Sequence, residues 1–185
     1  MAPPSIGPGR TAPLPPNAKT ETLGIAFFDL SRFAEWASSE QDAQVAGFLQ
    51  EFYALAAEYL GPAGGRIVKC MGDAGLAVFP EEAGEPVIDA LCSLSVEARR
   101  LAHRNGLDAY LNVNVHVGPV ISGDFGPPGQ ERFDVIGKAV NIAARLGRRG
   151  VTLSPQAFRC LDREARGRFE KITRPVTYCL RSTDR

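Results

Sequence analysis

Two acidic side chains occur at points in the chain where chemistry is plausible. Asp29 ends the apolar segment IAFFD, and Asp73 lies in the turn of the segment KCMGDAG. A carboxylate next to apolar residues is costly to bury unless it is paired or bound to a cation. Two such carboxylates on neighbouring strands would suit Mg²⁺, which takes a few carboxylates together with phosphate oxygens. Each acid taken alone is more simply explained as a solvated residue at a strand end or in a turn.

A third segment, FDVIGKAVNIAARL, adds polar groups of another kind. It carries Asp134 on a predicted strand, and then Asn141 and Arg145 at a spacing of four residues, which places both on one face of a helix. The fixed fork of donors on an arginine suits phosphate oxygens. The alternative for this pair is a surface arginine beside a capping asparagine.

The elements that must position these side chains follow from hydrophobic patterning. Apolar runs or alternation predict strands, and apolar residues at helical intervals predict helices. Ser38 and Gln41 have the capping-box spacing and are expected to begin the first helix. In chain order we expect a strand at 23–30, a helix at 45–59, strands at 66–70 and 75–79, a helix at 87–101, strands at 111–117 and 131–136, and a helix at 138–146.

The order strand, helix, two strands, helix, strand is the ferredoxin-like plan. A strand at 151–154, a helix opened by Ser154 and a strand at 176–181 form an extension after it. We therefore predict an α+β fold with a ferredoxin-like βαββαβ core and a C-terminal extension. In this plan the first strand and the hairpin are neighbours, which would bring Asp29 and Asp73 together. Many functions share the plan, so the fold alone does not decide between them.

The composition is that of one globular domain with a tail. The chain has 185 residues, of which 44% are hydrophobic and 23% charged. Six of the 14 prolines fall in the first 16 residues, so we expect residues 1–21 to form a disordered proline-rich tail and residues 22–185 to fold.

The charge balance, the apolar runs and the cysteines limit the partners. The 21 basic and 21 acidic residues leave no net charge, which disfavours binding to nucleic acid or to an anionic membrane. No apolar run approaches the roughly 18 residues of a membrane span, and the start lacks the apolar centre of a signal peptide. The four cysteines form no C-x-x-C pair. We expect reduced thiols in a cytoplasmic protein.

Three segments, IAFFDLSRF, GGRIVKCMGDAGLAVF and HVGPVISGDFGPPGQERFDVIGKAVNIAARL, occur in this order and together form a recognisable pattern. The chain resembles the class III nucleotidyl cyclases, the family of adenylyl and guanylyl cyclase catalytic domains, from about residue 23 to residue 146. The resemblance implies that Asp29 and Asp73 bind two Mg²⁺ or Mn²⁺ ions. It also implies that Lys69 and Asp134 recognise the base.

The chemistry of the base-reading pair favours ATP over GTP. Adenine presents an acceptor at N1 and a donor at its amino group, which match the donor-only lysine and the acceptor-only aspartate. Guanine presents the reverse pattern, and the guanylyl members carry Glu at the position of Lys69. A buried mismatch costs about 1–3 kcal/mol for each unpaired group. Use of GTP, CTP or UTP stays an alternative.

The resemblance gives Asn141 and Arg145 the catalytic roles of orienting the ribose and stabilising the phosphate in the transition state. It implies a homodimer of chains packed head to tail, in which one copy supplies the metal-binding aspartates and the other supplies the remaining site residues. The expected reaction converts ATP to 3′,5′-cyclic AMP and pyrophosphate by two-metal-ion catalysis, without a protein nucleophile.

The chain departs from the family pattern near the triphosphate. The family has a Gly-Phe-Thr stretch whose backbone amides hold the triphosphate, and here the stretch is Arg32, Phe33 and Ala34. Many members also carry an arginine where this chain has Asn112. We assign Arg32 and Phe33 to substrate binding, with the hypothesis that Arg32 supplies the charge that Asn112 lacks. Because of these departures, a degenerate cyclase that only binds nucleotide or dimerises stays an alternative interpretation. A ferredoxin-like RNA-binding module is disfavoured, since the aromatic sheet residues and the basic face are missing.

Overall fold

The computed structural model describes residues 13–147 and 150–181. The predicted core is confirmed. It consists of β1 (Lys19–Leu30), α2 (Asp42–Leu60), β2 (Arg66–Met71), β3 (Ala74–Pro80), α3 (Gly84–Arg104) and β4 (Leu111–Phe125).

Shorter elements occur between the elements of this core and after them in the chain. They are α1 (Phe33–Ala37) and the 3₁₀ turn η1 (Glu81–Ala83) within it, and after it β5 (Arg132–Ile136), α4 (Lys138–Ala143), β6 (Val151–Leu153), α5 (Pro155–Arg159), α6 (Arg163–Arg166), β7 (Phe169–Thr173) and β8 (Val176–Leu180).

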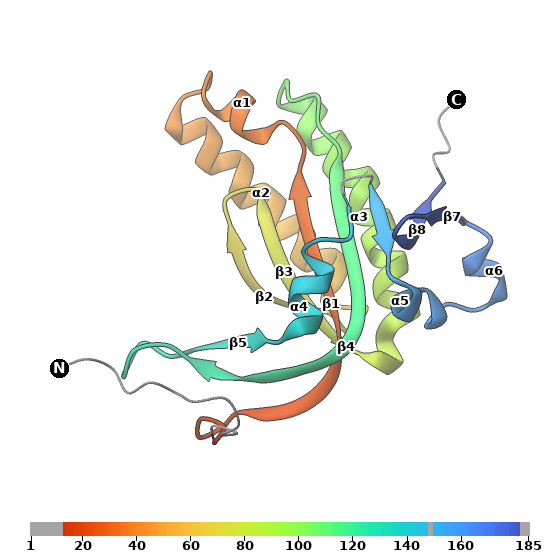
Figure 1. Ribbon diagram of the computed structural model, residues 1–185. Helices are drawn as coiled ribbons and strands as arrows, with labels where there is room; N and C mark the ends of the chain where they lie inside the picture. Colours follow the sequence, from red (N-terminus) through yellow and green to blue (C-terminus); the bar gives the residue numbers. More distant parts are fainter. Residues whose placement is uncertain (1–12, 148–149, 182–185) are drawn as a thin grey trace.

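One sheet organises the described residues. Its strand order is β2-β3-β1-β4-β6-β8-β7, and β5 pairs with the C-terminal end of β4. Figure 1 shows α2 and α3 on one face of this sheet and α4 on the other. The larger apolar cluster lies under α2 and α3 and includes Phe28, Phe52 and Leu91, whereas a smaller cluster under α4 includes Ile25 and Leu76.

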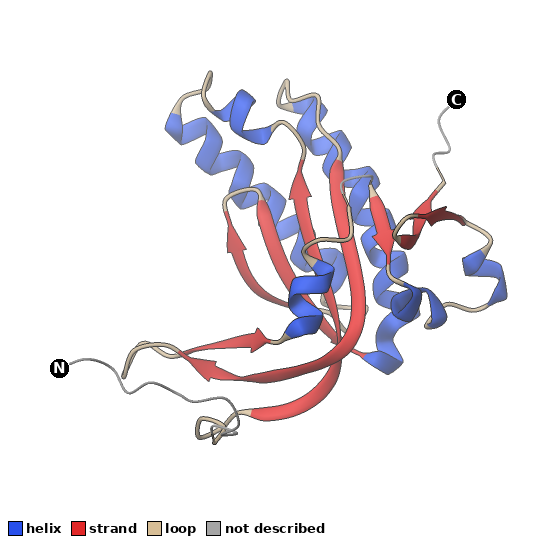
Figure 2. Cartoon of the chain, viewed as in Figure 1, coloured by secondary structure: helices blue, strands red, loops and turns tan. Residues whose placement is uncertain are grey.

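The first strand begins earlier than expected, and this corrects the boundary of the predicted tail. β1 starts at Lys19, and its first residues pair with the segment of β4 around Ser122. The Ser122 hydroxyl donates a hydrogen bond to the Glu21 carboxylate, and Lys19 forms an ion pair with the same side chain. Polar residues can occupy this strand because it extends beyond the core as an arm with β4 and β5 (Figure 2). Residues 1–12 of the predicted tail lie outside the described residues.

The start of the first long helix also differs from the prediction. Ser38 ends the short helix α1, and its hydroxyl donates to the Glu35 carbonyl instead of capping α2. α2 begins after Gln41 without a side-chain cap. The aromatic rings of α1 pack on Phe48 of α2, a tertiary contact that local capping patterns do not reveal. The strand β7 and the helix α6 were not predicted either.

A glycine sets the spacing of β1 and β3 next to the candidate site. Gly75 of β3 pairs with Phe28 of β1, and a Cβ atom on Gly75 would lie 2.1 Å from Cζ of the Phe28 ring. Any larger residue would push the ring away. The same pairing places Ala74 directly opposite Asp29 and therefore brings the β2–β3 turn to the end of β1.

Within the described ranges, no helix is both long enough and apolar enough to cross a membrane. The four cysteines are free thiols, and Cys92 and Cys179 are buried. Burial raises the pKa of the Cys92 thiol to about 11, which makes it a packing residue and a poor nucleophile at neutral pH.

Candidate active site

The two predicted metal-binding acids lie together at one edge of the core. Asp29 stands opposite Ala74 in the sheet, and Asp73 directly precedes Ala74 in the β2–β3 turn. Burial raises the pKa of the Asp73 carboxyl, and the negative charge of Asp29 raises it further, whereas hydrogen bonds from its own backbone N–H and that of Leu30 lower it. Two carboxylates that repel each other in a half-buried position are a suitable site for a cation.

The described residues provide these two acids without a larger ligand cluster. No group of three or more His, Cys, Asp or Glu side chains that could hold a metal ion occurs in residues 13–147 and 150–181. A cation at Asp29 and Asp73 would therefore take its remaining ligands from backbone, amide, water or phosphate oxygens.

A cavity of about 310 Å³ adjoins Asp29. It is lined by Phe27, Phe28, Asp29, Ala74, Asn114, Ala144, Arg145 and Gly147. One predicted catalytic residue, Arg145, thus shares a cavity with a predicted metal ligand within a single chain.

The second pair of predicted residues is in direct contact. Lys69 Nζ lies 2.6 Å from Asp134 Oδ2, and the Val135 backbone N–H donates to the other carboxylate oxygen at 2.8 Å. A β-bulge between Ile67 and Lys69 shifts the register of β2 at this point. Together these contacts join the edge strand β2 to β5 and leave both charged groups partly open to solvent.

The helix α4 displays the predicted catalytic pair, but it ends earlier than expected. Ala139 and Ala143 are buried against the sheet, and Asn141 is on the exposed side. The helix ends at Ala143, so Arg145 lies in the following turn, where its backbone N–H donates to the Ile142 carbonyl at 3.0 Å. The expected helix to residue 146 is therefore too long. The structure brings Arg145 but not Asn141 to the Asp29 cavity.

Arg32 and Phe33 point elsewhere. Arg32 has a φ of 59°, in the left-handed region, where a side chain is strained. Its guanidinium lies 3.2 Å from a Glu35 carboxylate oxygen and 3.4 Å from one of Asp108, outside the cavity next to Asp29. The Phe33 ring is buried against Trp36. Substrate binding by Arg32 and Phe33 therefore stays a prediction that involves either their backbone amides or a movement of Arg32.

Sequence reasoning assigned no role to Asn114, which lines the cavity. The sequence feature that could have indicated it is the alternation in the first half of β4. There Asn112, Asn114 and His116 occupy one face and apolar residues the other. His116 on this face is buried and bonded through Nδ1 to the Ser154 hydroxyl at 2.9 Å, as expected of a structural residue.

Comparison with known proteins identifies the fold and the sequence pattern. The sequence model of one protein family, the adenylate and guanylate cyclase catalytic domain, matches residues 16–177 of this chain. The chain belongs to this family. The match begins before the predicted domain boundary at residue 22, in agreement with the early start of β1.

Curated relatives of this cyclase domain are longer proteins. An uncharacterized protein of Mycobacterium tuberculosis, Rv1319c, is 30% identical over 124 residues, which are 66% of this chain and 23% of the relative. The uncharacterized protein Mb1352c of Mycobacterium bovis is 30% identical over 155 residues, which are 80% of this chain and 28% of the relative. The cyclase domain therefore spans less than a third of these relatives.

Solved structures similar to the cyclase domain include both nucleotide specificities. A bacterial light-regulated adenylyl cyclase has a TM-score of 0.78 at 21% identity, covering 88% of this chain and 52% of that one. The guanylyl cyclase Cya2 has a TM-score of 0.76 at 17% identity, covering 88% and 92%. The adenylyl cyclase CyaB from P. aeruginosa has a TM-score of 0.75 at 17% identity, covering 91% and 97%. The shared fold does not distinguish ATP from GTP.

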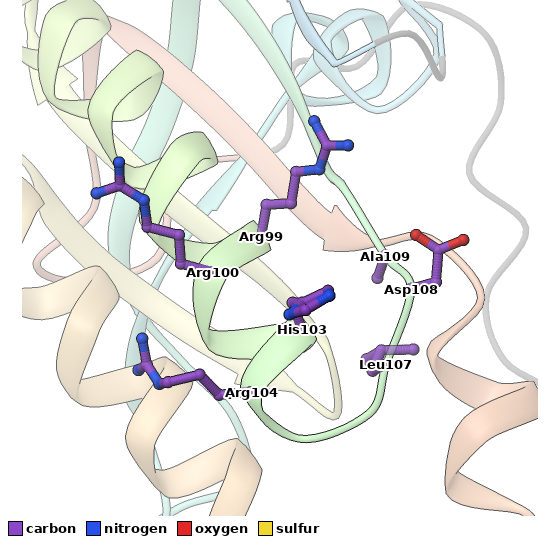
Figure 3. Close-up of a pocket in the computed structure, with 7 residues that line it drawn as sticks. All are labelled: Arg99, Arg100, His103, Arg104, Leu107, Asp108 and Ala109. Atoms are coloured by element: carbon purple, nitrogen blue, oxygen red, sulfur yellow. The ribbon is translucent and has the colours of Figure 1, made fainter.

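The cyclase domain has a second cavity, of about 450 Å³, at the end of α3. Four basic side chains of α3 and the segment from Leu107 to Ala109 line it (Figure 3). In this view the guanidinium group of Arg99 points away from those of Arg100 and Arg104, so the three do not converge on a common point. Cations are favourable at a helix C-terminus, and Arg100 also pairs with Glu97 at 2.5 Å. The positions of His103 and Arg104 in the last turn are therefore explained by helix stability, and Asp29 does not line this cavity.

Proposed function

We propose that this cyclase domain is an adenylate cyclase that forms 3′,5′-cyclic AMP and pyrophosphate at a homodimer interface. The contact between Lys69 and Asp134 is the observation that carries the proposal. An ammonium group held beside a carboxylate presents a donor and an acceptor side by side, as N1 and the amino group of adenine require. Guanine would place a donor against the ammonium group and leave polar groups unpaired.

The acids Asp29 and Asp73 would hold two Mg²⁺ or Mn²⁺ ions. Their fit to cations is supported by the mutual repulsion of the two carboxylates and by the burial that raises the pKa of Asp73. Bound there, the cations would lower the pKa of the ribose 3′-hydroxyl and neutralise the charge of the departing pyrophosphate.

The reaction exchanges one phosphorus–oxygen bond for another. The ribose 3′-oxygen forms a bond to the α-phosphorus, the bond from the α-phosphorus to the oxygen bridging it to the β-phosphorus breaks, and the hydroxyl proton passes to solvent. Asn141 would orient the ribose, and the Arg145 guanidinium would stabilise the charge that develops on the α-phosphate oxygens. Positioning and charge stabilisation supply the rate, so no side chain has to form a covalent intermediate.

A second copy of the chain would complete the site. Three exposed apolar side chains lie close in sequence to predicted site residues: Met71 at the end of β2, Ile136 at the end of β5 and Ile142 on α4. Between 45% and 58% of each remains exposed, and we propose these three side chains as contacts for the second copy. We propose that one copy supplies Asp29 and Asp73 and the other reads the base. Because the proposed substrate is ATP, we place the protein in the cytoplasm.

The direct test is product identification. Purified protein is incubated separately with ATP, GTP, CTP and UTP, each with Mg²⁺ or Mn²⁺, and the products are separated by chromatography and identified by mass. We expect cyclic AMP from ATP as the main product. Cyclisation of another nucleotide at a higher kcat/KM would refute the assignment of Lys69 and Asp134 to adenine.

A nucleotide-binding or dimerisation module without activity is the second candidate. It is favoured by the left-handed backbone of Arg32 and by the ion pairs that hold its guanidinium away from the Asp29 cavity. Binding of ATP without any cyclic product, with either metal, would establish this alternative.

A further inference from the structure

Two asparagines on β4 have buried side-chain oxygens that lack a hydrogen-bond partner among the described residues. Asn112 is 3% exposed and Asn114 is 8% exposed, and the Oδ1 atom of each is unpaired. Leaving a buried acceptor unpaired is costly, because the hydrogen bonds that it makes to water in the unfolded chain are not replaced. Such atoms are rare in folded proteins, and an ion or an ordered water molecule often provides the missing partner.

The sheet register places both asparagines next to Asp29. Asn112 is the direct partner of Asp29 across the β1–β4 ladder, and Asn114 is the partner of Phe27, one step along the same face. Directly opposite residues in an antiparallel pair have Cα atoms about 5 Å apart. Asn114 also lines the cavity of about 310 Å³ that Asp29 lines. The unpaired oxygens thus belong to the surroundings of a predicted metal ligand.

One contact fixes the orientation of the Asn114 amide. Its Nδ2 donates to the Gly147 carbonyl at 2.9 Å. Turning the amide around would put its oxygen against that carbonyl oxygen, and two acceptors repel each other. The oxygen of Asn114 is therefore the end left without a partner.

This arrangement selects the chemistry of what can bind. The carboxylate of Asp29 and the amide oxygens of Asn112 and Asn114 are all acceptors. These three groups match a cation or the protons of water molecules bound to it, whereas the Arg145 guanidinium in the same cavity is the group suited to phosphate oxygens. Hydrated divalent cations retain water ligands that need such acceptors.

We propose that Asn114, with Asn112 beside it, holds water ligands of the divalent cation bound at Asp29. This inference rests on the proposed function, because it assigns a further residue to the same metal site. Asn114 is then a positioning residue. Outer groups of this kind orient the ligands of a metal, and their loss lowers metal affinity about 10–100-fold.

A purely structural role for Asn114 makes a different prediction. Its bond to Gly147 holds the turn that carries Arg145, and losing that bond would disturb Arg145 without changing the affinity for a cation. The variant Asn114→Asp separates the two roles, since a carboxylate still accepts hydrogen bonds from water but cannot donate to Gly147.

The test measures Mn²⁺ binding by electron paramagnetic resonance in the presence of α,β-methylene-ATP, which cannot be cyclised. We expect Asn114→Ala and the similarly shaped Asn114→Leu to weaken Mn²⁺ binding at least tenfold, and Asn114→Asp to bind Mn²⁺ as tightly as the wild type or more tightly. Asn105→Ala is the matched control, because Asn105 also donates from Nδ2 to a backbone carbonyl, that of Leu101, at 3.0 Å. It should not change the affinity. Circular dichroism melts show which variants fold, and one folded apolar variant is sufficient.

The outcomes separate this inference from the proposed function. Wild-type affinity in a folded Asn114→Ala or Asn114→Leu variant, with weakened binding in Asp29→Ala, would overturn the role of Asn114 and leave the metal site in place. Unchanged affinity in Asp29→Ala would overturn the metal site itself, and the inference would fail with it.

Discussion

Lys69 of β2 and Asp134 of β5 form an ion pair with 2.6 Å between Nζ and Oδ2. The side chains are 41% and 28% exposed, and such pairs contribute only about 0–1 kcal/mol to stability. The pair therefore contributes little to folding, and replacing Lys69 should leave the fold intact.

The substitution Lys69→Glu should reduce the preference for ATP over GTP. Glutamate accepts the N1–H of guanine and repels the N1 acceptor of adenine. Because each mismatch costs about 1–3 kcal/mol, the ratio of kcat/KM for ATP to that for GTP should fall at least tenfold. Combining it with Asp134→Asn relieves the repulsion of the two carboxylates and should strengthen the change.

Charge reversal by itself provides the control for this experiment. Arg163 is exposed on α6, outside the site. The variant Arg163→Glu should retain the wild-type ratio. An unchanged ratio in a folded Lys69→Glu variant would show that Lys69 does not read the base.

The strained backbone of Arg32 predicts opposite effects of two substitutions. Arg32→Gly removes the strain of the left-handed conformation, which outweighs the loss of its exposed ion pairs, and should raise Tm by about 2–4 °C. Arg32→Ala keeps the strain and loses the contacts to Glu35 and Asp108, so its Tm should fall slightly. Differential scanning calorimetry distinguishes the two results, and equal Tm values for both variants would contradict the strain.

The same two variants test the prediction that Arg32 binds the triphosphate. If its guanidinium leaves Glu35 and Asp108 to bind phosphate, KM for Mg-ATP should rise in both variants. An unchanged KM in both variants would show that Arg32 does not bind the triphosphate.

His116 makes stability depend on pH. Burial lowers its pKa below the value of about 6.5 that it has in an unfolded chain, so the unfolded state binds the proton more readily. Its contribution to stability is complete above about pH 6.5 and is lost as the pH falls from there toward the folded-state pKa. His116→Asn can keep the bond to Ser154 without titrating. Urea unfolding between pH 5 and 7.5 should show a smaller loss in the variant than in the wild type, and identical losses would contradict this role.

The main elements of the fold were predictable from sequence because their signals are local. The apolar run that ends at Asp29, the turn around Asp73 and the alternation of β4 each specify an element without reference to the rest of the chain. The ferredoxin-like order then brings Asp29 and Asp73 together. The approach of Lys69 to Asp134 followed from the family resemblance and from no local pattern.

The remaining features depend on contacts between distant segments. The polar start of β1 at Lys19 is ordered by pairing with β4, and α1 by packing of Trp36 on Phe48. The turn that carries Arg145 is tethered by Asn114, 33 residues away from the carbonyl of Gly147. No spacing in the sequence indicates such partners, so neither the end of α4 nor the unpaired oxygen of Asn114 could be predicted.

The position of Arg145 leaves two arrangements of the site to be distinguished. Arg145 and Asp29 line one cavity of a single chain, whereas the proposed site combines Asp29 and Asp73 of one copy with Asn141 and Arg145 of another. Only the second arrangement can be restored by mixing two inactive variants.

The most direct measurement of the central claim is cyclic AMP formation by mixed dimers. Asp73→Ala and Asn141→Ala, each inactive alone, are co-expressed with different affinity tags so that mixed dimers can be purified and counted. A random mixture should regain about a quarter of the wild-type activity, because half of the dimers are mixed and each has one intact site of two. A mixture of Asp29→Ala and Asp73→Ala should stay inactive. Each site takes both acids from one copy, so every site in this mixture lacks one acid. Absence of recovery in purified mixed dimers of Asp73→Ala and Asn141→Ala would contradict a site shared between two copies.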